Sequence, residues 1–223
     1  MTAAARKPAA PRRRGRPPAG PDRDVRGALL EAARTLFLQR GYAGVSVRQL
    51  AGAAGVNPAM VKYYFDGKPG LYAAMLQEVI GPLAARVEAM VAAPAADSPD
   101  LAGFLGDYMR TVAAHPWLPA LILRDVLAPD GHFRDRFVHD FAGRVAPKAA
   151  ELARRGVQLG RMRGDLDPRL TVISMLSLGL WPFLAMPVLQ QALKLEPDEK
   201  TVEALIRHTV RLFAAGIAVE ANS

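Results

Sequence analysis

Residues 46–65 contain the signals of two short helices around a tight turn, and this segment constrains the fold more than any other part of the chain. Ser46 and Gln49 have the spacing of a capping box, in which each side chain binds the backbone N–H of the other residue. Gly55 can take the positive φ that a turn requires. The pair Asn57-Pro58 then supplies a second N-cap and a proline in the first helical turn. This order of features predicts a helix-turn-helix unit.

Flanking helices are predicted from apolar spacing on both sides of this unit. Asp22 or Asp24 can cap a first helix, whose apolar residues recur three and four positions apart until Gly41. A longer helix is expected to begin near Lys68, after the third helix has ended. Residues 22–82 are therefore expected to form a three-helix domain with a longer helix leading out of it.

The rest of the sequence predicts helices only. Their expected ranges are 100–114, 117–127, 131–160, 168–193 and 198–219. No alternation of polar and apolar residues is long enough to argue for a strand. The fold class is therefore all-α, with about nine helices, and residues 83–223 are expected to form a larger C-terminal domain.

Positive charge gathers at the start of the chain. Residues 1–21 hold six bases and no acid, and residues 22–70 hold seven bases and four acids. Residues 71–223 hold 16 bases and 17 acids. The first segment is built from Ala, Pro, Arg and Gly, so it is expected to form a disordered basic arm. A basic N-terminal third on an otherwise nearly neutral chain indicates a polyanionic partner for the N-terminal third only.

Several chemistries lack the residues that they need. The absence of cysteine excludes disulfides, thiol nucleophiles and cysteine-based zinc sites, and it makes a reducing cytoplasm the expected compartment. His132 and His139 stand seven apart, and a solvated surface explains them better than a metal site does. No glycine-rich phosphate loop or nucleophile elbow is present. We therefore expect no enzyme activity, no cofactor and no metal.

Residues 170–193 carry no charge and are numerous enough to cross a bilayer. Pro182 and Pro187 interrupt this run, and serine and glutamine dilute it. Such a stretch is more often a helix buried against a partner, so we expect an interface rather than a membrane span.

The order of motifs resembles the TetR family of transcriptional regulators, of the TetR/AcrR type. The resemblance covers about residues 24–82 and is carried by 41–47, 51–57, Tyr63-Tyr64-Phe65 and Lys68 before Leu71. It implies an all-helical homodimer that represses promoters and releases DNA when a small molecule enters the C-terminal domain. Many members have Thr and Tyr at the positions of Met60 and Lys62, and Ser and Glu at those of Gly67 and Pro69.

The third helix is the element expected to enter the major groove. Lys62 could donate to guanine, and Ala59 and the Tyr63 ring could contact a thymine methyl, whereas Val61 and Phe65 are expected to face the core. Ser46, Arg48, Tyr64 and Lys68 are better placed to grip phosphates. The predicted DNA-binding set in this domain is Ser46, Val47, Arg48, Asn57, Pro58, Ala59, Met60, Lys62, Tyr63, Tyr64 and Lys68.

The basic arm adds Arg14 and Arg16 to this set. The sequence Arg14-Gly15-Arg16-Pro17 resembles an AT-hook core, which would fit a narrow A·T minor groove. The other interpretation is a charged tail that adds only salt-sensitive affinity.

One short reading helix contacts few bases, so a homodimer on a palindromic operator is expected. The dimer is expected to form through about 168–219. Gly179, Ser174 and Ser177 would permit close approach, and Trp181 and Phe183 would supply buried area. The last helix would contribute Val202, Leu205, Ile206, Thr209, Leu212 and Phe213.

An effector pocket needs apolar walls and a few polar groups. The candidate wall residues are Phe104, Tyr108, Trp117, Leu121, Met175, Leu178 and Met186, with His115, Arg124 and Asp125 nearby in sequence. Any one of them is more often a plain core residue than a pocket residue. The methionine and aromatic content favours an apolar or aromatic effector.

The sequence therefore predicts a cytoplasmic, sequence-specific DNA-binding repressor that is released by a small molecule. The alternative is an architectural DNA-binding protein, which the basic arm holds on DNA without sequence preference.

Overall fold

The computed structural model describes residues 24–94, 100–196 and 198–219. Within these ranges the chain forms nine continuous helical stretches and no strand, which confirms the predicted all-α class. The stretches are α1 (Val25–Arg40), α2 (Val47–Ala54), α3 (Ala59–Phe65), α4 (Lys68–Ala92), α5 (Leu101–Ala114), α6 (Leu118–Ile122) with the π-helical turn η1 (Leu123–Leu127), α7 (Arg134–Phe137) with the π-helical turn η2 (Val138–Ala142) and α8 (Gly143–Gln158), α9 (Pro168–Leu193) and α10 (Glu199–Ile217). The predicted contacts of Arg14 and Arg16 lie outside the described residues.

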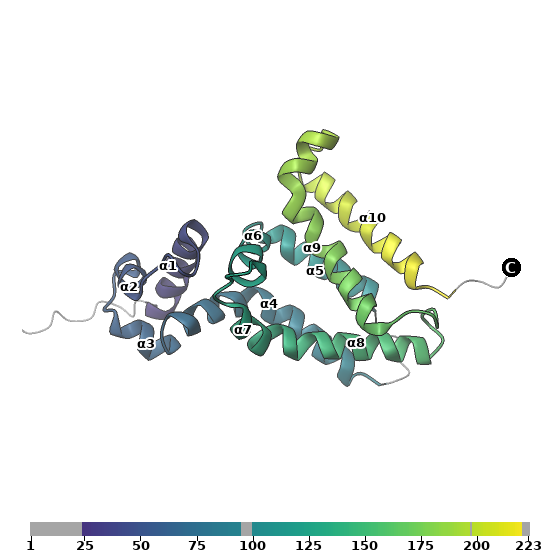
Figure 1. Cartoon of the computed structure of the whole chain (residues 1–223), viewed down its shortest axis with the longest axis horizontal. Coiled ribbons are helices and arrows are strands. Elements are labelled where there is room, and N and C mark those ends of the chain that lie inside the picture. The colour runs from purple at the N-terminus through teal and green to yellow at the C-terminus, as the bar shows by residue number, and fades with distance from the viewer. Residues whose placement is uncertain (1–23, 95–99, 197, 220–223) are drawn as a thin grey trace, which may run out of the picture.

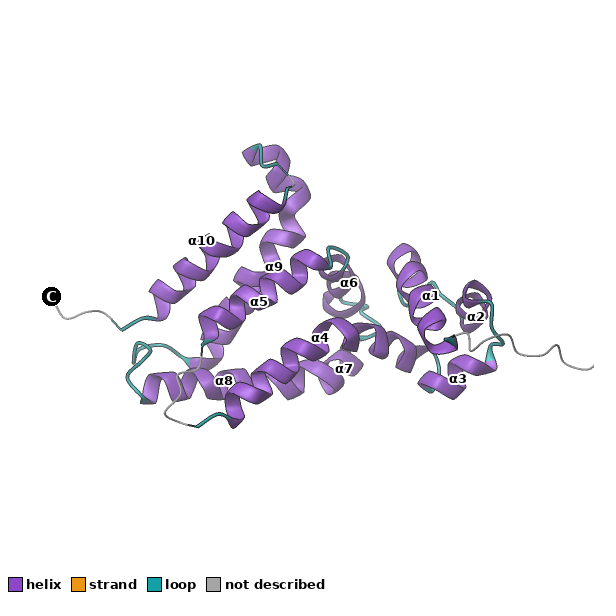
Figure 2. Ribbon diagram, turned by 180° about the vertical axis from the view of Figure 1, so that it is seen from behind, coloured by secondary structure: helices purple, strands orange, loops and turns teal. Residues whose placement is uncertain are grey.

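The helices are gathered at two ends of an elongated molecule (Figure 1). Helices α1, α2 and α3 lie at one end, and α8, α9 and α10 lie toward the other. Helix α4 leads from the first group into the second, and Figure 2 shows α6 and α7 between the two groups from the opposite side.

The local signals around the helix-turn-helix unit act as the sequence predicts. The Ser46 hydroxyl accepts from the Gln49 backbone N–H at 3.3 Å, and the Gln49 side chain accepts from the Ser46 N–H at 2.8 Å. Gly55 takes the left-handed conformation, with φ of 65° and ψ of 35°. The Asn57 side chain accepts from the N–H of Ala59, the first residue of α3, at 2.9 Å, and Pro58 stands at the N-cap rather than inside the helix. These caps satisfy backbone groups that helix ends otherwise leave without partners.

Two hydrophobic cores hold the molecule together. The first joins α1, α2, α3 and the first half of α4, and it also takes in side chains from α6, η1 and the segment that follows, including Phe133 and Phe141. The second joins the later part of α4 with α5, α8, α9 and α10. Helix α4 crosses from one core to the other between Val79 and Val87. Part of the C-terminal sequence, residues 118–141, therefore packs on the core of the N-terminal helices.

The seven residues predicted to line an effector pocket do not form one group. Trp117 and Leu121 pack in the first core, whereas Phe104, Tyr108, Met175 and Leu178 pack in the second. Met186 is half-buried on α9 and belongs to neither core. The reason is that the side chains of Trp117 and of α6 pack into the first core, although α6 also contacts α9.

The apolar face of α10 is used inside the chain. Ile206, Thr209 and Phe213 are buried, and Val202 and Leu205 pack partly against the second core. Of the six residues that the sequence assigned to a partner, Leu212 alone is largely exposed, at 56%. This face of α10 therefore packs against α5 and α9 of its own chain.

Gly179 does permit a close approach, but within the same chain. A Cβ atom at this position would lie 2.5 Å from Tyr108 ring carbons on α5. The predicted role of Gly179 in approaching a partner helix is therefore corrected: its missing side chain makes room for Tyr108.

Candidate nucleic-acid interface

Helix α3 is held by one face and open on the other. Val61 and Phe65 are buried in the first core, at 0% and 8% exposure, as the sequence predicts. The opposite face leaves Tyr63 77% exposed and Tyr64 42% exposed. Their rings meet edge to face with centroids 5.0 Å apart, which restricts both side chains. A short helix with a fixed inner face thus presents two aromatic rings to solvent.

The remaining predicted contacts of this helix are also accessible. Asn57, Pro58, Ala59 and Lys62 are exposed at and after the start of α3, and Met60 is half-buried. Together with the two tyrosines they form one surface, which we call the α3 face. It combines a cation, rings and small groups that suit base edges.

Lys62 forms an ion pair with Asp66, one helical turn further on. The Asp66 carboxylate accepts a hydrogen bond from the Lys62 ammonium, which lowers the pKa of Asp66. Both side chains are largely exposed, at 76% and 86%. Exposed pairs of this kind contribute little stability, so a base or phosphate can replace Asp66 as the partner of Lys62.

Helix α2 adds a second set of groups. Ser46 and Arg48 are exposed, and Val47 is half-buried against the first core. The Ser46 hydroxyl already takes part in the capping box and donates toward the Gln49 side chain at 3.0 Å. Arg48 is therefore the accessible cation of α2 that remains for a phosphate.

Lys68 is engaged mainly in contacts within the chain. Its ammonium donates to the backbone carbonyls of Tyr42 and Val45, each at 2.9 Å, and lies 4.3 Å from the centroid of the Tyr42 ring. Burial lowers the pKa of Lys68. Because two of its three donors are occupied by the fold, Lys68 has one donor left for the predicted phosphate contact.

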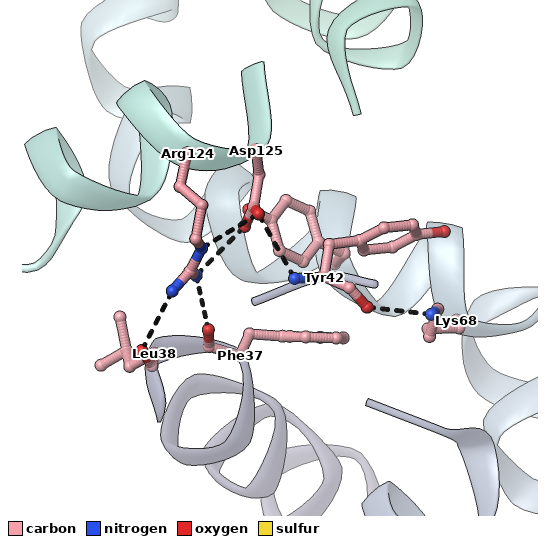
Figure 3. Close-up of polar contacts among 7 residues, drawn as sticks. Phe37, Leu38, Tyr42, Lys68, Arg124 and Asp125 are labelled. Carbon is pink, nitrogen blue, oxygen red and sulfur yellow. Dashed lines mark hydrogen bonds and ion pairs between the residues drawn. The ribbon is translucent and has the colours of Figure 1, made fainter. Parts of the chain in front are cut away.

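Two predicted pocket neighbours lie at a different place in the molecule. Arg124 and Asp125, on η1, contact the end of α1 and the residues after it (Figure 3). Adjacent opposite charges in an apolar helix were visible in the sequence, but their partners 83 and 87 positions away were not. These two residues therefore join two parts of the chain.

Comparison with known proteins identifies the family. The family described as bacterial regulatory proteins, tetR family, matches residues 29–75, which contain the helix-turn-helix unit. The HTH-type transcriptional repressor AcnR of Corynebacterium diphtheriae is 33% identical over 147 residues, which are 63% of this chain and 70% of that protein. The chain belongs to the TetR family. This TetR-family protein is accordingly a DNA-binding transcriptional regulator.

Solved structures agree on the fold of this TetR-family regulator. The ketosteroid transcriptional regulator KstR2 of Mycobacterium tuberculosis superposes with a TM-score of 0.63 at 20% identity, covering 91% of this chain and 99% of that one. FadR from Bacillus subtilis, solved in complex with stearoyl-CoA, gives 0.64 at 19% identity over 86% and 98%. At these identities the likeness concerns the fold alone.

Within the described residues, no group of three or more His, Asp or Glu side chains could hold a metal ion. Among the helices of the described ranges, α9 is the one that is long and apolar enough to cross a membrane. Only 17% of its most apolar window is buried within the chain, so its surface needs another explanation.

Proposed function

We propose that this protein is a homodimeric repressor that reads a palindromic operator and leaves it when a small apolar or aromatic effector binds. The α3 face is the observation that supports α3 as the helix that reads the base sequence. Tyr63 is 77% exposed on a helix whose other side is fixed in the core. A large exposed ring beside Lys62 suits a helix that enters the major groove.

Phosphate contacts would set the register of this helix. Arg48 on α2 and Tyr64 on α3 flank the reading residues and are exposed. Arg26, on α1, was not predicted from the sequence; it is exposed and lies over the Phe65 ring, 5.5 Å from its centroid. We add it to the phosphate set, because it approaches α3 from a second element.

The dimer is supported by the outer face of α9. Leu170, Ile173, Trp181 and Val188 recur at helical spacing and are 58–68% exposed. Together we call them the α9 face. Contiguous apolar surface of this kind marks a protein interface or a membrane contact, and membership of a DNA-binding family favours a second copy of the chain in the cytoplasm.

The effector site is supported by composition and by shape. An open groove of about 720 Å³ lies between α8 and the start of α9, with Val172, Ile173 and Leu176 among its apolar walls. It borders the α9 face, so a second copy would enclose it further. FadR of Bacillus subtilis was solved with stearoyl-CoA, which carries an apolar chain, and supports an apolar effector for this fold.

An architectural protein remains the second candidate, because residues 1–21 carry six bases and no acid. Competition experiments at rising salt separate the two functions. A repressor keeps its preference for one labelled site over random duplex DNA, because base contacts do not depend on counterion release. If preference and total binding disappeared together, the architectural function would replace the one proposed.

A further inference from the structure

Arg124 and Asp125 belong to η1 in the C-terminal sequence, yet their side chains bind the N-terminal helices. The Arg124 guanidinium donates to the carbonyl of Phe37 at 2.7 Å and to that of Leu38 at 3.3 Å (Figure 3). Asp125 accepts from the Tyr42 backbone N–H at 3.4 Å. We call these two residues the Arg124–Asp125 clasp.

The clasp completes the C-terminal end of α1. The last carbonyls of a helix lack donors from within the helix, and Leu38 lies in the final turn of α1. The Phe37 carbonyl accepts from the Gly41 backbone N–H at 2.9 Å, and Arg124 supplies its second donor. A planar guanidinium can bridge two such carbonyls and a carboxylate at once. Gly41, with φ of 74°, leaves room for it, because a Cβ atom there would lie 3.0 Å from the Arg124 Nε. One part of the chain thus caps a helix of the other part.

The carboxylate of Asp125 depends on partners from several elements. It is 5% exposed, and it accepts from the Tyr72 hydroxyl at 2.7 Å and from Arg124 at 3.1 and 3.2 Å. A buried carboxylate is costly when any of these donors leaves. Its partners come from α4, from η1 and from the loop after α1. The arrangement therefore favours one docked position of η1 over intermediate positions.

A continuous set of contacts leads from the clasp to the start of α2. Tyr42 follows α1 and contacts Tyr72 and Phe133 through its ring. The carbonyls of Tyr42 and Val45 are both held by Lys68. Ser46, the next residue, caps α2. Any movement of η1 against α1 therefore bears on the segment that positions the helix-turn-helix unit.

The backbone of η1 itself is unusual. The Ala128 N–H reaches the Leu123 carbonyl at 2.8 Å, five residues back, which widens the turn. Such π-helical turns are rare and occur often at functional sites. This one continues from α6, which also contacts α9. The clasp thus lies at the junction between the helices proposed to sense an effector and those proposed to read DNA.

We propose that Arg124 and Asp125 are positioning residues, which couple the state of the C-terminal domain to the placement of the reading helix. The proposal rests on the function proposed above and adds the contact that transmits regulation. It also changes the role expected for these residues, from polar groups of an effector pocket to a link between domains. Because coupling between sites is reciprocal, binding of operator DNA must act on η1 just as an effector acts on α3.

Hydrogen exchange measured by mass spectrometry tests this on the intact chain. The probe is duplex DNA selected by the wild-type protein, so no effector is needed. The variants are Arg124→Ala, which removes the guanidinium of the clasp, and Arg155→Ala as a matched control. Arg155 donates to the carbonyls of Val91 and Ala93 at the end of α4, which is the same kind of contact within the C-terminal part alone. Arg124→Lys tests whether charge without the planar fork suffices.

In the wild type, DNA is expected to slow exchange in α1–α3 and, by about tenfold, in residues 118–137. In Arg124→Ala, DNA is expected to protect α1–α3 but no longer residues 118–137. Arg124→Lys is expected to behave like Arg124→Ala. Arg155→Ala is expected to behave like the wild type. Unchanged exchange in α9 and α10 of the free variants shows that the fold is intact. Equal protection of 118–137 in Arg124→Ala and wild type, or none in the wild type, overturns the proposal.

A failure of the proposed repressor function would give a different result from a failure of the clasp proposal. If the wild type selects no DNA sequence, the regulatory role of the clasp falls with it. The free proteins then still decide whether the contact holds α1. Faster exchange at the end of α1 in Arg124→Ala than in Arg155→Ala supports the clasp, and equal rates contradict it.

Discussion

The hydroxyl of Tyr72 donates to the carboxylate of Asp125 at 2.7 Å, across 53 positions of sequence. Burial and this hydrogen bond raise the pKa of Tyr72, so the ring stays a neutral donor. Removing the hydroxyl in Tyr72→Phe leaves a buried carboxylate with one donor fewer. We expect the free energy of unfolding to fall by about 1–3 kcal/mol in urea denaturation. A loss of less than about 0.5 kcal/mol would mean that Asp125 gains little from Tyr72.

Gly179 is expected to resist a larger side chain. A Cβ atom there would meet the Tyr108 ring at 2.5 Å and Leu105 at 3.1 Å, so α5 and α9 must separate. Gly179→Ala should lower the free energy of unfolding by about 1–3 kcal/mol. Gly216→Ala is the matched control, because it lies in α10 with nothing within 4 Å of an added Cβ atom. That variant should gain stability, by about 0.5–1 kcal/mol, and equal effects of the two would contradict the packing described.

The α3 face predicts a loss of selectivity rather than of all binding. In Lys62→Ala with Tyr63→Ala, discrimination between the selected site and random DNA should fall by about 1–3 kcal/mol for each base-specific interaction that the substitutions remove. Affinity for random DNA should change much less. Lys200→Ala, an exposed lysine on α10, controls for loss of charge. Fluorescence anisotropy with both duplexes measures the two affinities, and retained selectivity in the double variant would remove α3 as the reading helix.

The α9 face predicts a dimer that one charge disrupts. Trp181 is 63% exposed, and Trp181→Asp would place a carboxylate inside the proposed interface. Sedimentation of the wild type should give the mass of two chains, and that of the variant the mass of one. Val138→Asp changes an apolar residue of 49% exposure on η2, away from α9, and should stay dimeric. A monomeric wild type, or an unaffected Trp181→Asp, contradicts the interface.

The basic arm predicts a dependence of DNA affinity on salt. Each phosphate contact contributes about −0.9 to the slope of log affinity against log salt concentration. A chain that lacks residues 1–21 loses six bases, so its slope should flatten by several such steps. If the arm only adds charge, discrimination between DNA sequences at fixed salt should be unchanged. If Arg14 and Arg16 enter the minor groove, the preference for A·T base pairs should decrease. An unchanged slope would mean that the arm does not touch DNA.

Local signals explain why the N-terminal part could be predicted in detail. The capping box of Ser46 and Gln49, the turn at Gly55 and the cap at Asn57 each act over a few neighbouring residues, so the sequence displays them directly. The inward faces of Val61 and Phe65 follow from helical spacing in the same way.

Long-range packing explains what could not be predicted. Whether Phe213 faces α5 or a partner depends on how α10 docks, and helical spacing is the same in both cases. Lys68 is drawn to the carbonyls of Tyr42 and Val45 by a loop conformation that its own neighbours do not reveal. The expected pocket residues separate for the same reason, because Leu121 turns to the first core and residues of α9 turn to the second.

Two copies of this chain are proposed to read a specific site through α3. This proposal is tested by selecting binding sites from random duplex DNA with the purified protein at about physiological salt. We expect a palindrome whose half-sites lie a whole number of helical turns apart, each turn about 10 base pairs. Recovery of sequences with no shared motif, while the protein still binds DNA, would contradict it.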